Sequence, residues 1–196
     1  MKISNLTKSY ENHVVLNKLT LNLEKGHLYA IMGASGCGKT TLLHTLLGIL
    51  EPDSGSIEKD GEKISSVVFQ ENRLFDFLTA GENVAAIQKK PSKPEEINQV
   101  LTEILPKASL EQKVEEFSGG MKRRVAIGRA MLAESDVIVM DEPLTGLDEG
   151  TRDQVIAFIL KYRRGRTLIF STHQEKEVEL FGAEKIVLSC SFMADR

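Results

Sequence analysis

The sequence predicts an α/β fold in which a mainly parallel sheet is covered by helices on both faces. Strand-length apolar runs alternate with helix-length segments, residues 71–117 change to a charged and helical pattern, and residues 3–23 alternate apolar and polar side chains with period two. We therefore expect one domain over residues 1–196. Its core and an N-terminal antiparallel β subdomain should occupy 1–70 and 118–196, with a helical subdomain inserted at 71–117.

The composition argues against several classes of function. A formal net charge of -3 disfavours a general nucleic-acid binder, which needs clustered Lys and Arg to release phosphate counterions. The two cysteines, Cys37 and Cys190, are too few for a disulfide framework and suit a reducing cytosol. No apolar run approaches the roughly 18–20 residues of a membrane span, and the N-terminus lacks the apolar core of a signal peptide. We expect a cytoplasmic protein that reaches a membrane only through a partner.

The first third of the chain is expected to form strands, one helix and a hairpin. Residues 3–23 are predicted to be antiparallel strands closed by a turn at Lys25 and Gly26. The run "HLYAIMG" is a strand that enters a glycine-rich loop, and "KTTLLHTLLGIL" places its leucines on one face of a helix. Two turn signals in "EPDSGSIEKDGEKI" predict a small hairpin before the strand "SSVVFQ".

The middle of the chain is expected to be helical, and strands alternate with helices after it. Pro94 suits the first turn of a helix, and Ile97, Leu101, Ile104 and Leu105 are spaced along one face. The strand "DVIVM", a helix over roughly 151–163, the strand "TLIFS", another helix and the strand "KIVLS" follow in that order.

A phosphate-binding loop is predicted by "GASGCGKT", which fits G-x-x-x-x-G-K-[ST] and follows a strand while opening a helix. Glycines there let backbone N–H groups turn inward around phosphates, and the helix N-terminus favours negative charge. Lys39 should reach the β and γ oxygens of ATP, Thr40 should offer its hydroxyl to Mg²⁺, and the Cys37 side chain should pack. This indicates a P-loop NTPase core. The residues predicted to surround the phosphates are Gly33, Ala34, Ser35, Gly36, Cys37, Gly38, Lys39, Thr40 and Thr41.

Two adjacent acids end the apolar strand in "VIVMDEP". Ligands of parallel α/β sheets collect at the carboxyl ends of the strands. Because a strand alternates its faces, the two carboxylates can divide their roles: Asp141 holds the Mg²⁺ shell, and Glu142 acts as the general base for the attacking water.

The stretch "EEFSGGMKRRVAIGRAM" places Ser118 at a helix N-cap and Gly119 and Gly120 in the first turn. A serine hydroxyl and open N–H groups at the positive end of a helix make a second phosphate site. Because one chain binding one nucleotide already has its phosphate loop, we expect this second site to face the nucleotide of another molecule.

Three cations follow this second site. Lys122, Arg123 and Arg124 lie on a helix whose buried face should contain Met121, Val125 and Leu132. We expect most of this charge to form a solvated face.

In this order, the phosphate loop, "VVFQE", "FSGGM", "VIVMDEP", "LTGLD" and "STHQ" resemble the ATP-binding subunit of ABC transporters over nearly the whole chain. The resemblance implies an ATPase of which two copies meet head to tail, with the Ser-Gly-Gly of one copy on the γ-phosphate held by the other. It also implies an integral membrane permease as partner at the inner face of the cell membrane. An importer would further work with an extracytoplasmic solute-binding protein.

The resemblance assigns roles to four further residues. Tyr10 resembles the aromatic that stacks on adenine, and Gln70 the glutamine that links the Mg²⁺ site to the membrane partner. Asp148 is similar to the acid of the loop that crosses the dimer seam, and His173 to the histidine that senses the γ-phosphate.

The finer assignment is to an importer of a small solute, similar to the branch that imports nitrate, sulfonates and taurine. Met121 departs from the commonest signature, which has Gln there, but the contact through Ser118 and backbone is retained. ABC ATPases of lipoprotein release, efflux or cell division are the alternative. A DNA-repair ATPase would carry a long coiled coil, for which residues 41–136 hold no heptads, and a nucleotide sensor should lack Glu142.

An unusually apolar cluster follows Gln70. Leu74, Phe75, Phe77 and Leu78 are expected to form part of an exposed groove for a helix of the membrane partner, with core packing of the helical subdomain as the alternative.

Overall fold

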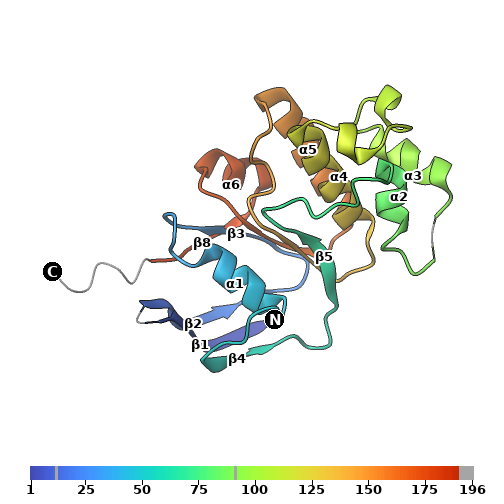
Figure 1. Ribbon diagram of the computed structural model, residues 1–196. Helices are drawn as coiled ribbons and strands as arrows, with labels where there is room; N and C mark the ends of the chain where they lie inside the picture. The colour runs from blue at the N-terminus through green and yellow to red at the C-terminus, as the bar shows by residue number, and fades with distance from the viewer. Residues whose placement is uncertain (12, 91, 190–196) are drawn as a thin grey trace.

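The computed structural model describes residues 1–11, 13–90 and 92–189, and its framework is a five-stranded parallel sheet (Figure 1). The strand order is β5-β6-β7-β3-β8. The strands are β3 (Leu28–Met32), β5 (Ile64–Val68), β6 (Val137–Met140), β7 (Thr167–Ser171) and β8 (Glu184–Val187). The predicted mainly parallel sheet is confirmed.

Side chains of this sheet alternate between two apolar cores, as the period of a strand requires. On β6, Ile138 and Met140 pack into one core, and Val137 and Val139 pack into the other. All four are buried, which explains why this strand reads as a continuous apolar run. The apolar runs of the sequence are therefore a result of burial on both faces.

The first core lies beneath three helices, α4 (Gly119–Leu132), α5 (Glu149–Tyr162) and α6 (Glu175–Phe181). The opposite core is covered by the single helix α1 (Lys39–Leu46) together with the antiparallel sheet (Figure 1). Helices were expected on both faces of the parallel sheet. This prediction is confirmed for the face beneath α4, α5 and α6, and only partly for the other face, because the antiparallel sheet shares that face with α1. Leu42, Leu43 and Leu46 of α1 are fully buried because they fill the space between the two sheets.

The antiparallel sheet has the order β2-β1-β4, with β1 (Lys2–Tyr10), β2 (His13–Asn22) and β4 (Ser54–Glu58). The predicted pairing of residues 3–23 is confirmed by the β1–β2 register. The hairpin expected within 51–64 is wrong. β4 pairs with β1 instead, and β5 joins the parallel sheet, because each apolar strand face is buried better against a distant partner than against its neighbour in sequence.

Short helices occupy the middle of the chain. They are α2 (Ala80–Ala85), α3 (Pro94–Leu101), η1 (Lys107–Ser109) and η2 (Val114–Glu116). Ile97, Leu101 and Leu105 share a third apolar cluster with Val125 of α4, while Ile104 packs into the first core. The predicted apolar face is thus buried, and α4 joins these helices to the rest of the protein.

None of the described helices has the length and apolar character that would be needed to cross a membrane.

The contact between β4 and β1 generates a stability prediction. Gly55 has φ +89°, and a Cβ there would lie 2.4 Å from the Asn5 carbonyl oxygen. Gly61 also has a positive φ, +74°, but no atom lies within 4 Å of its Cβ position. Gly55→Ala should therefore lower the free energy of unfolding by about 1–3 kcal/mol more than Gly61→Ala, because only the first change forces backbone apart. Urea unfolding of the two variants measures the difference; equal losses would contradict the steric explanation.

Candidate functional site

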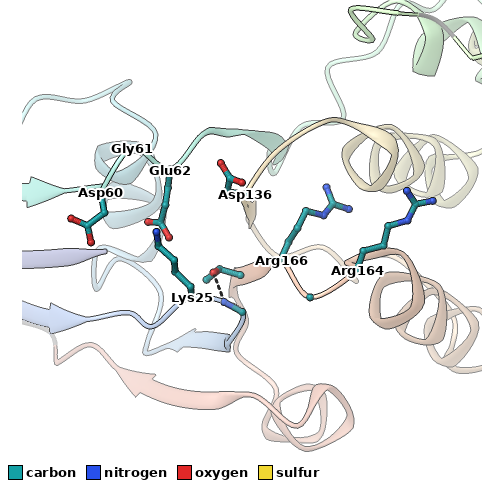
Figure 2. A pocket seen from close by; sticks show the side chains of 10 residues that line it. Lys25, Asp60, Gly61, Glu62, Asp136, Arg164 and Arg166 are labelled. Carbon is teal, nitrogen blue, oxygen red and sulfur yellow. Dashed lines mark hydrogen bonds between the residues drawn. The ribbon is translucent and has the colours of Figure 1, made fainter.

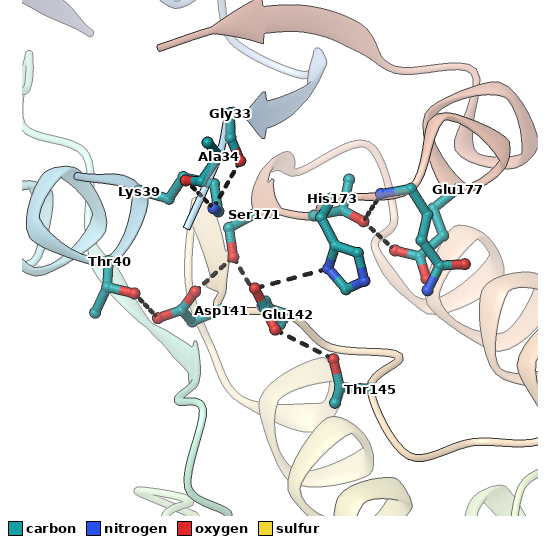
Figure 3. A network of polar contacts seen from close by, with 12 residues as sticks. Gly33, Ala34, Lys39, Thr40, Asp141, Glu142, Thr145, Ser171, His173 and Glu177 are labelled. Carbon is teal, nitrogen blue, oxygen red and sulfur yellow. Dashed lines mark hydrogen bonds and ion pairs between the residues drawn. The ribbon is translucent and has the colours of Figure 1, made fainter. Parts of the chain in front are cut away.

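The phosphate loop connects β3 to α1, and its geometry follows from two residues. Gly38 is the N-cap of α1 with φ 96°, and a Cβ there would lie 2.7 Å from Val15 Cγ1. Lys39 is buried, and its Nζ donates to the carbonyl oxygens of Gly33 at 2.9 Å and Ala34 at 3.1 Å (Figure 3). The loop therefore folds around the lysine and keeps a cation at the N-terminal end of α1.

Asp141 is held at the centre of the site by hydroxyl groups on both sides (Figure 3). Thr40 Oγ1 donates to Asp141 Oδ2 at 2.7 Å, and Ser171 Oγ donates to Asp141 Oδ1 at 2.5 Å. The side chain lies one residue beyond β6, and only 4% of Asp141 is exposed. These contacts link α1, β6 and β7 through one carboxylate.

Glu142 is more exposed and lies on a strained backbone. Its φ is 45°, an unfavourable conformation for a residue other than glycine. The backbone N–H donates to Ser171 Oγ at 2.8 Å, and the carbonyl oxygen accepts from Arg123 Nη2 at 2.7 Å. The carboxylate lies 3.8 Å from His173 Nδ1 and accepts from Thr145 Oγ1 at 3.4 Å. The two adjacent acids thus have different surroundings, as expected from the alternation of a strand.

A cavity of about 530 Å³ joins most of the predicted residues. It is lined by Tyr10, Val15, Ser35, Gly36, Gly38, Lys39, Thr40, Thr41, Gln70, Glu142 and His173. The phosphate loop, Glu142 and three residues assigned by resemblance, Tyr10, Gln70 and His173, therefore line one cavity.

Cys37 is a member of the loop whose side chain does not face this space. It is buried in the core between α1 and the antiparallel sheet, as predicted for packing. Its backbone N–H donates to the Ala34 carbonyl oxygen at 3.2 Å, which helps to close the loop.

The second predicted phosphate site lies outside the cavity. Ser118 is the N-cap of α4 and accepts from the Met121 backbone N–H at 3.2 Å, and Gly119 has no atom within 4 Å of its Cβ position. A Cβ on Gly120 would be in ordinary contact with Leu147, so this helix end lies beside the loop that leads to Asp148.

Asp148 is itself a helix cap. Its carboxylate accepts the Thr151 backbone N–H at 3.0 Å at the start of α5, and this bond lowers the pKa of the Asp148 carboxyl below its usual value. Neither Asp148 nor the Ser-Gly-Gly segment lines the cavity that holds the phosphate loop.

The cation run is not the solvated face that the sequence predicted. Arg123 is only 4% exposed, and Arg124 is half-buried, with its Nη1 donating to the Ile104 carbonyl oxygen at 2.7 Å. Lys122 forms a 3.2 Å ion pair with Asp76. The prediction is wrong because backbone carbonyl groups of neighbouring segments, rather than water, satisfy the buried guanidinium groups.

Sequence reasoning missed Ser171 and Arg123. Arg123 precedes the buried Ile127 and Ala130 by four and seven residues, so helical spacing placed it on the inner face of α4. Ser171 had no comparable signal, since a serine at the end of an apolar strand is an ordinary feature.

A second cavity lies at the other end of the sheet (Figure 2). It measures about 330 Å³ and mixes the acids Asp60, Glu62 and Asp136 with Lys25 and Arg164. Among the described residues, its lining includes no helix N-terminus preceded by a glycine-rich loop. We therefore take the first cavity as the candidate phosphate-binding site.

A loop that surrounds a lysine at a helix N-terminus, with a serine- and threonine-bonded aspartate beside it, defines a nucleotide-binding P-loop protein. The ABC transporter family matches residues 16–145. The taurine import ATP-binding protein TauB of Roseobacter denitrificans is 36% identical and is aligned over 96% of this chain and 77% of its own length. The chain belongs to the ABC transporter family, and it is an ATPase of that family.

Other relatives agree with this assignment. The spermidine/putrescine import ATP-binding protein PotA of Thermotoga maritima is 36% identical over 90% of this chain and 52% of its own length. The dimeric structure of the bacterial ABC transporter cassette MJ0796 has a TM-score of 0.81 and 27% identity, covering 95% of this chain and 93% of that one. A dimeric post-hydrolysis state of the same cassette, bound to ADP and Pi, has a TM-score of 0.80 and 26% identity, covering 96% and 94%.

Proposed function

We propose that the chain is the ATP-hydrolysing subunit of an ABC importer for a small solute, and that two copies close on two ATP molecules. The observation that carries this proposal is that Glu142, His173 and Gln70 line the same cavity as the phosphate loop. The domain comprises 1–196, with the helical subdomain at 71–117 inserted into the core.

The residues of the cavity divide the chemistry of hydrolysis. Lys39 binds the β and γ oxygens of ATP, and the ring of Tyr10 stacks on adenine. The Glu142 carboxylate accepts a proton from the attacking water, a contribution of about 10²- to 10⁴-fold for a positioned general base. His173, 3.8 Å from that carboxylate, contacts the γ-phosphate and so reports its presence.

Thr40, Gln70 and Asp141 would hold Mg²⁺. The Thr40 hydroxyl and the Asp141 carboxylate are hard oxygen donors 2.7 Å apart, and Gln70 lines the same cavity, which fits an ion that prefers one or two carboxylates plus substrate phosphates. Mg²⁺ bound there would neutralise charge on the phosphate oxygens. The hydroxyl of Ser171 meanwhile keeps Asp141 oriented toward Thr40.

A second copy completes the site. Ser118, Gly119 and Gly120 have open hydrogen-bonding groups at a helix N-terminus but lie outside their own chain's cavity, and Asp148 lies on the neighbouring loop. A head-to-tail dimer places these groups on the γ-phosphate of the other copy. The dimeric cassette structures support the pairing of two copies.

Transport requires membrane and extracytoplasmic partners. The taurine and polyamine import proteins support import, and we propose an integral permease, with an extracytoplasmic solute-binding protein, as the other components. The chain then sits at the cytoplasmic face of the membrane through the permease. Phe77 and Phe75, 65% and 45% exposed, form an aromatic pair 6.1 Å apart that suits a helix of the permease.

Glu142→Gln tests the hydrolysis mechanism and the dimer together. The change removes the base but keeps the size of the side chain, so hydrolysis should fall about 10²- to 10⁴-fold while ATP still binds. ATP should then hold two copies together, and light scattering after size-exclusion chromatography at high protein concentration should detect a dimer with ATP and a monomer with ADP.

Ser118→Arg in the Glu142→Gln background is the control, because its bulk would occupy the place of the phosphate and should abolish the dimer. If Glu142→Gln without the second change stays monomeric while it demonstrably carries ATP, the two-copy mechanism is wrong. Wild-type hydrolysis by Glu142→Gln would show that the base is misassigned.

Tyr10→Ala should weaken ATP binding and leave turnover at saturation nearly unchanged, because the ring lies far from the reacting phosphorus. Base stacking is worth about 1–3 kcal/mol, so KM should rise roughly 5- to 150-fold. Tyr10→Phe, which keeps the stacking face, should behave like the wild type. Steady-state kinetics separate the two constants, and a large fall in kcat for Tyr10→Ala would contradict the role in stacking.

Cross-linking tests the proposed permease surface. Phe77→Cys in the assembled complex should be captured by a cysteine on a cytoplasmic helix of the permease, whereas Leu180→Cys, 40% exposed on α6, should not. Equal capture, or none at Phe77, would argue that the aromatic pair has another use.

A further inference from the structure

The guanidinium of Arg123 contacts the backbone of two loops that flank the candidate site. Nη2 donates to the carbonyl oxygens of Asp141 at 2.6 Å and Glu142 at 2.7 Å, and Nε donates to Pro143 at 3.0 Å. Nη1 donates to the carbonyl oxygen of Phe69 at 2.5 Å. One buried side chain therefore joins the end of β6 to the segment that follows β5.

The same nitrogen reaches further along that second segment. Nη1 also lies 3.4 Å from the Gln70 carbonyl oxygen and 3.4 Å from Asn72 Oδ1. Gln70 lines the nucleotide cavity, so the guanidinium contacts the backbone of a cavity residue.

Only arginine can make this set of contacts. Its planar guanidinium has donors on three nitrogen atoms in a fixed fork, whereas a lysine ammonium has three donors on one atom. Burial lowers the pKa of the Arg123 guanidinium, and the carboxylates of Asp141 and Glu142 oppose that shift. The ordinary pKa is so high that the group remains charged at neutral pH.

The backbone of Glu142 depends on this contact. A φ of 45° is strained for a residue other than glycine and persists only where the surroundings fix it. Ser171 fixes the N–H and Arg123 fixes the carbonyl group, so the peptide units on both sides of the Glu142 Cα are held. The direction of the carboxylate follows from that backbone.

Two neighbouring cations of α4 hold the same segment after β5. Arg129 donates to the carbonyl oxygens of Arg73 at 2.8 Å and Asn72 at 3.3 Å, and Lys122 pairs with Asp76. Helix α4 begins at the Ser118 cap. The segment 69–76 is therefore fastened along the helix whose N-terminus carries the second phosphate site.

We propose that Arg123 is a positioning residue for ATP hydrolysis. It fixes Glu142 and Gln70 relative to each other, and it ties both to the helix that presents Ser118 to the second copy. The inference rests on the proposed roles of Glu142 and Gln70. A purely structural arginine would stabilise the fold without affecting the rate at saturating ATP.

Arg166 provides a matched control. It is half-buried and also binds carbonyl groups, those of Met131 and Tyr162 at 2.7 Å and of Ala133 and Arg163 at 2.9 Å. It lies at the opposite end of the sheet, beside the cavity of Figure 2. Losing either guanidinium should cost stability, but only Arg123 adjoins the nucleotide cavity.

The experiment compares Arg123→Gln, Arg123→Lys, Arg166→Gln and Glu142→Gln by melting temperature, affinity for a fluorescent ATP analogue, and kcat at saturating ATP. A misplacement of about 1 Å costs up to about 10²-fold in rate. We expect kcat to fall about 10- to 100-fold in both Arg123 variants while the nucleotide Kd changes less than about threefold. Arg166→Gln should lower the melting temperature and keep kcat within about twofold of the wild type.

Amide hydrogen exchange gives a readout that is independent of turnover. Arg123→Gln should accelerate exchange in residues 69–73, whereas Arg166→Gln should leave that segment unchanged. If Arg123→Gln does not fold, Arg123→Lys decides, because it keeps the charge but cannot span the carbonyl groups.

The results separate the two levels of the proposal. Wild-type kcat in Arg123→Lys, or a loss of nucleotide affinity as large as the loss of rate, would overturn the positioning role. Equal kcat values in Arg123→Gln and Arg166→Gln would also overturn the positioning role. If Glu142→Gln hydrolyses ATP at the wild-type rate, the assignment of the base is wrong; if it is inactive while Arg123→Gln is not slowed, only the positioning role is wrong.

Discussion

The parallel pairing of β6 with β7 is the constraint on which the site depends. Its register places Met140 beside Phe170, so the next residues meet: Asp141 directly follows β6, and Ser171 is the last residue of β7. The hydroxyl of Ser171 then donates to the Asp141 carboxylate and accepts the Glu142 N–H. A shift of one residue would turn the acids to the opposite faces of the sheet and separate them from the phosphate loop.

Burial decides how the polar groups at this edge behave. Asp141 is nearly inaccessible and has hydroxyl donors on both oxygen atoms, so its orientation is set before any ligand arrives. The Glu142 side chain keeps 25% of its surface exposed and faces the cavity beside His173. The two adjacent carboxylates therefore differ in their surroundings: at the end of β6, Asp141 is buried and Glu142 faces the cavity.

The helix α4 unites two functions that are separate in sequence. Its N-terminus leaves open N–H groups behind Ser118, while its interior sends Arg123 to the carbonyl groups of both neighbouring loops. A charge inside a protein is stable only when its donors are satisfied, and here the satisfying groups are the backbone that positions Glu142 and Gln70. The stability of the fold and the geometry of the site thus use the same contacts.

The sequence by itself determined the parallel sheet, the phosphate loop, the acids after β6 and the N-cap at Ser118. Each of these follows from local physics: apolar runs buried on both faces, glycines before a helix, carboxylates at a strand end and a serine that caps a helix. Only the tertiary structure decided two other features. β4 pairs with β1 instead of forming the expected local hairpin. Arg123 was expected on a solvated face but is buried. Strand pairing and the satisfaction of a buried charge depend on partners that are distant in sequence: 47 residues separate Thr7 of β1 from its partner Ser54 of β4, and 54 separate Arg123 from Phe69. Local patterns cannot specify which of several distant groups will meet, because that choice is made by the packing of the whole chain.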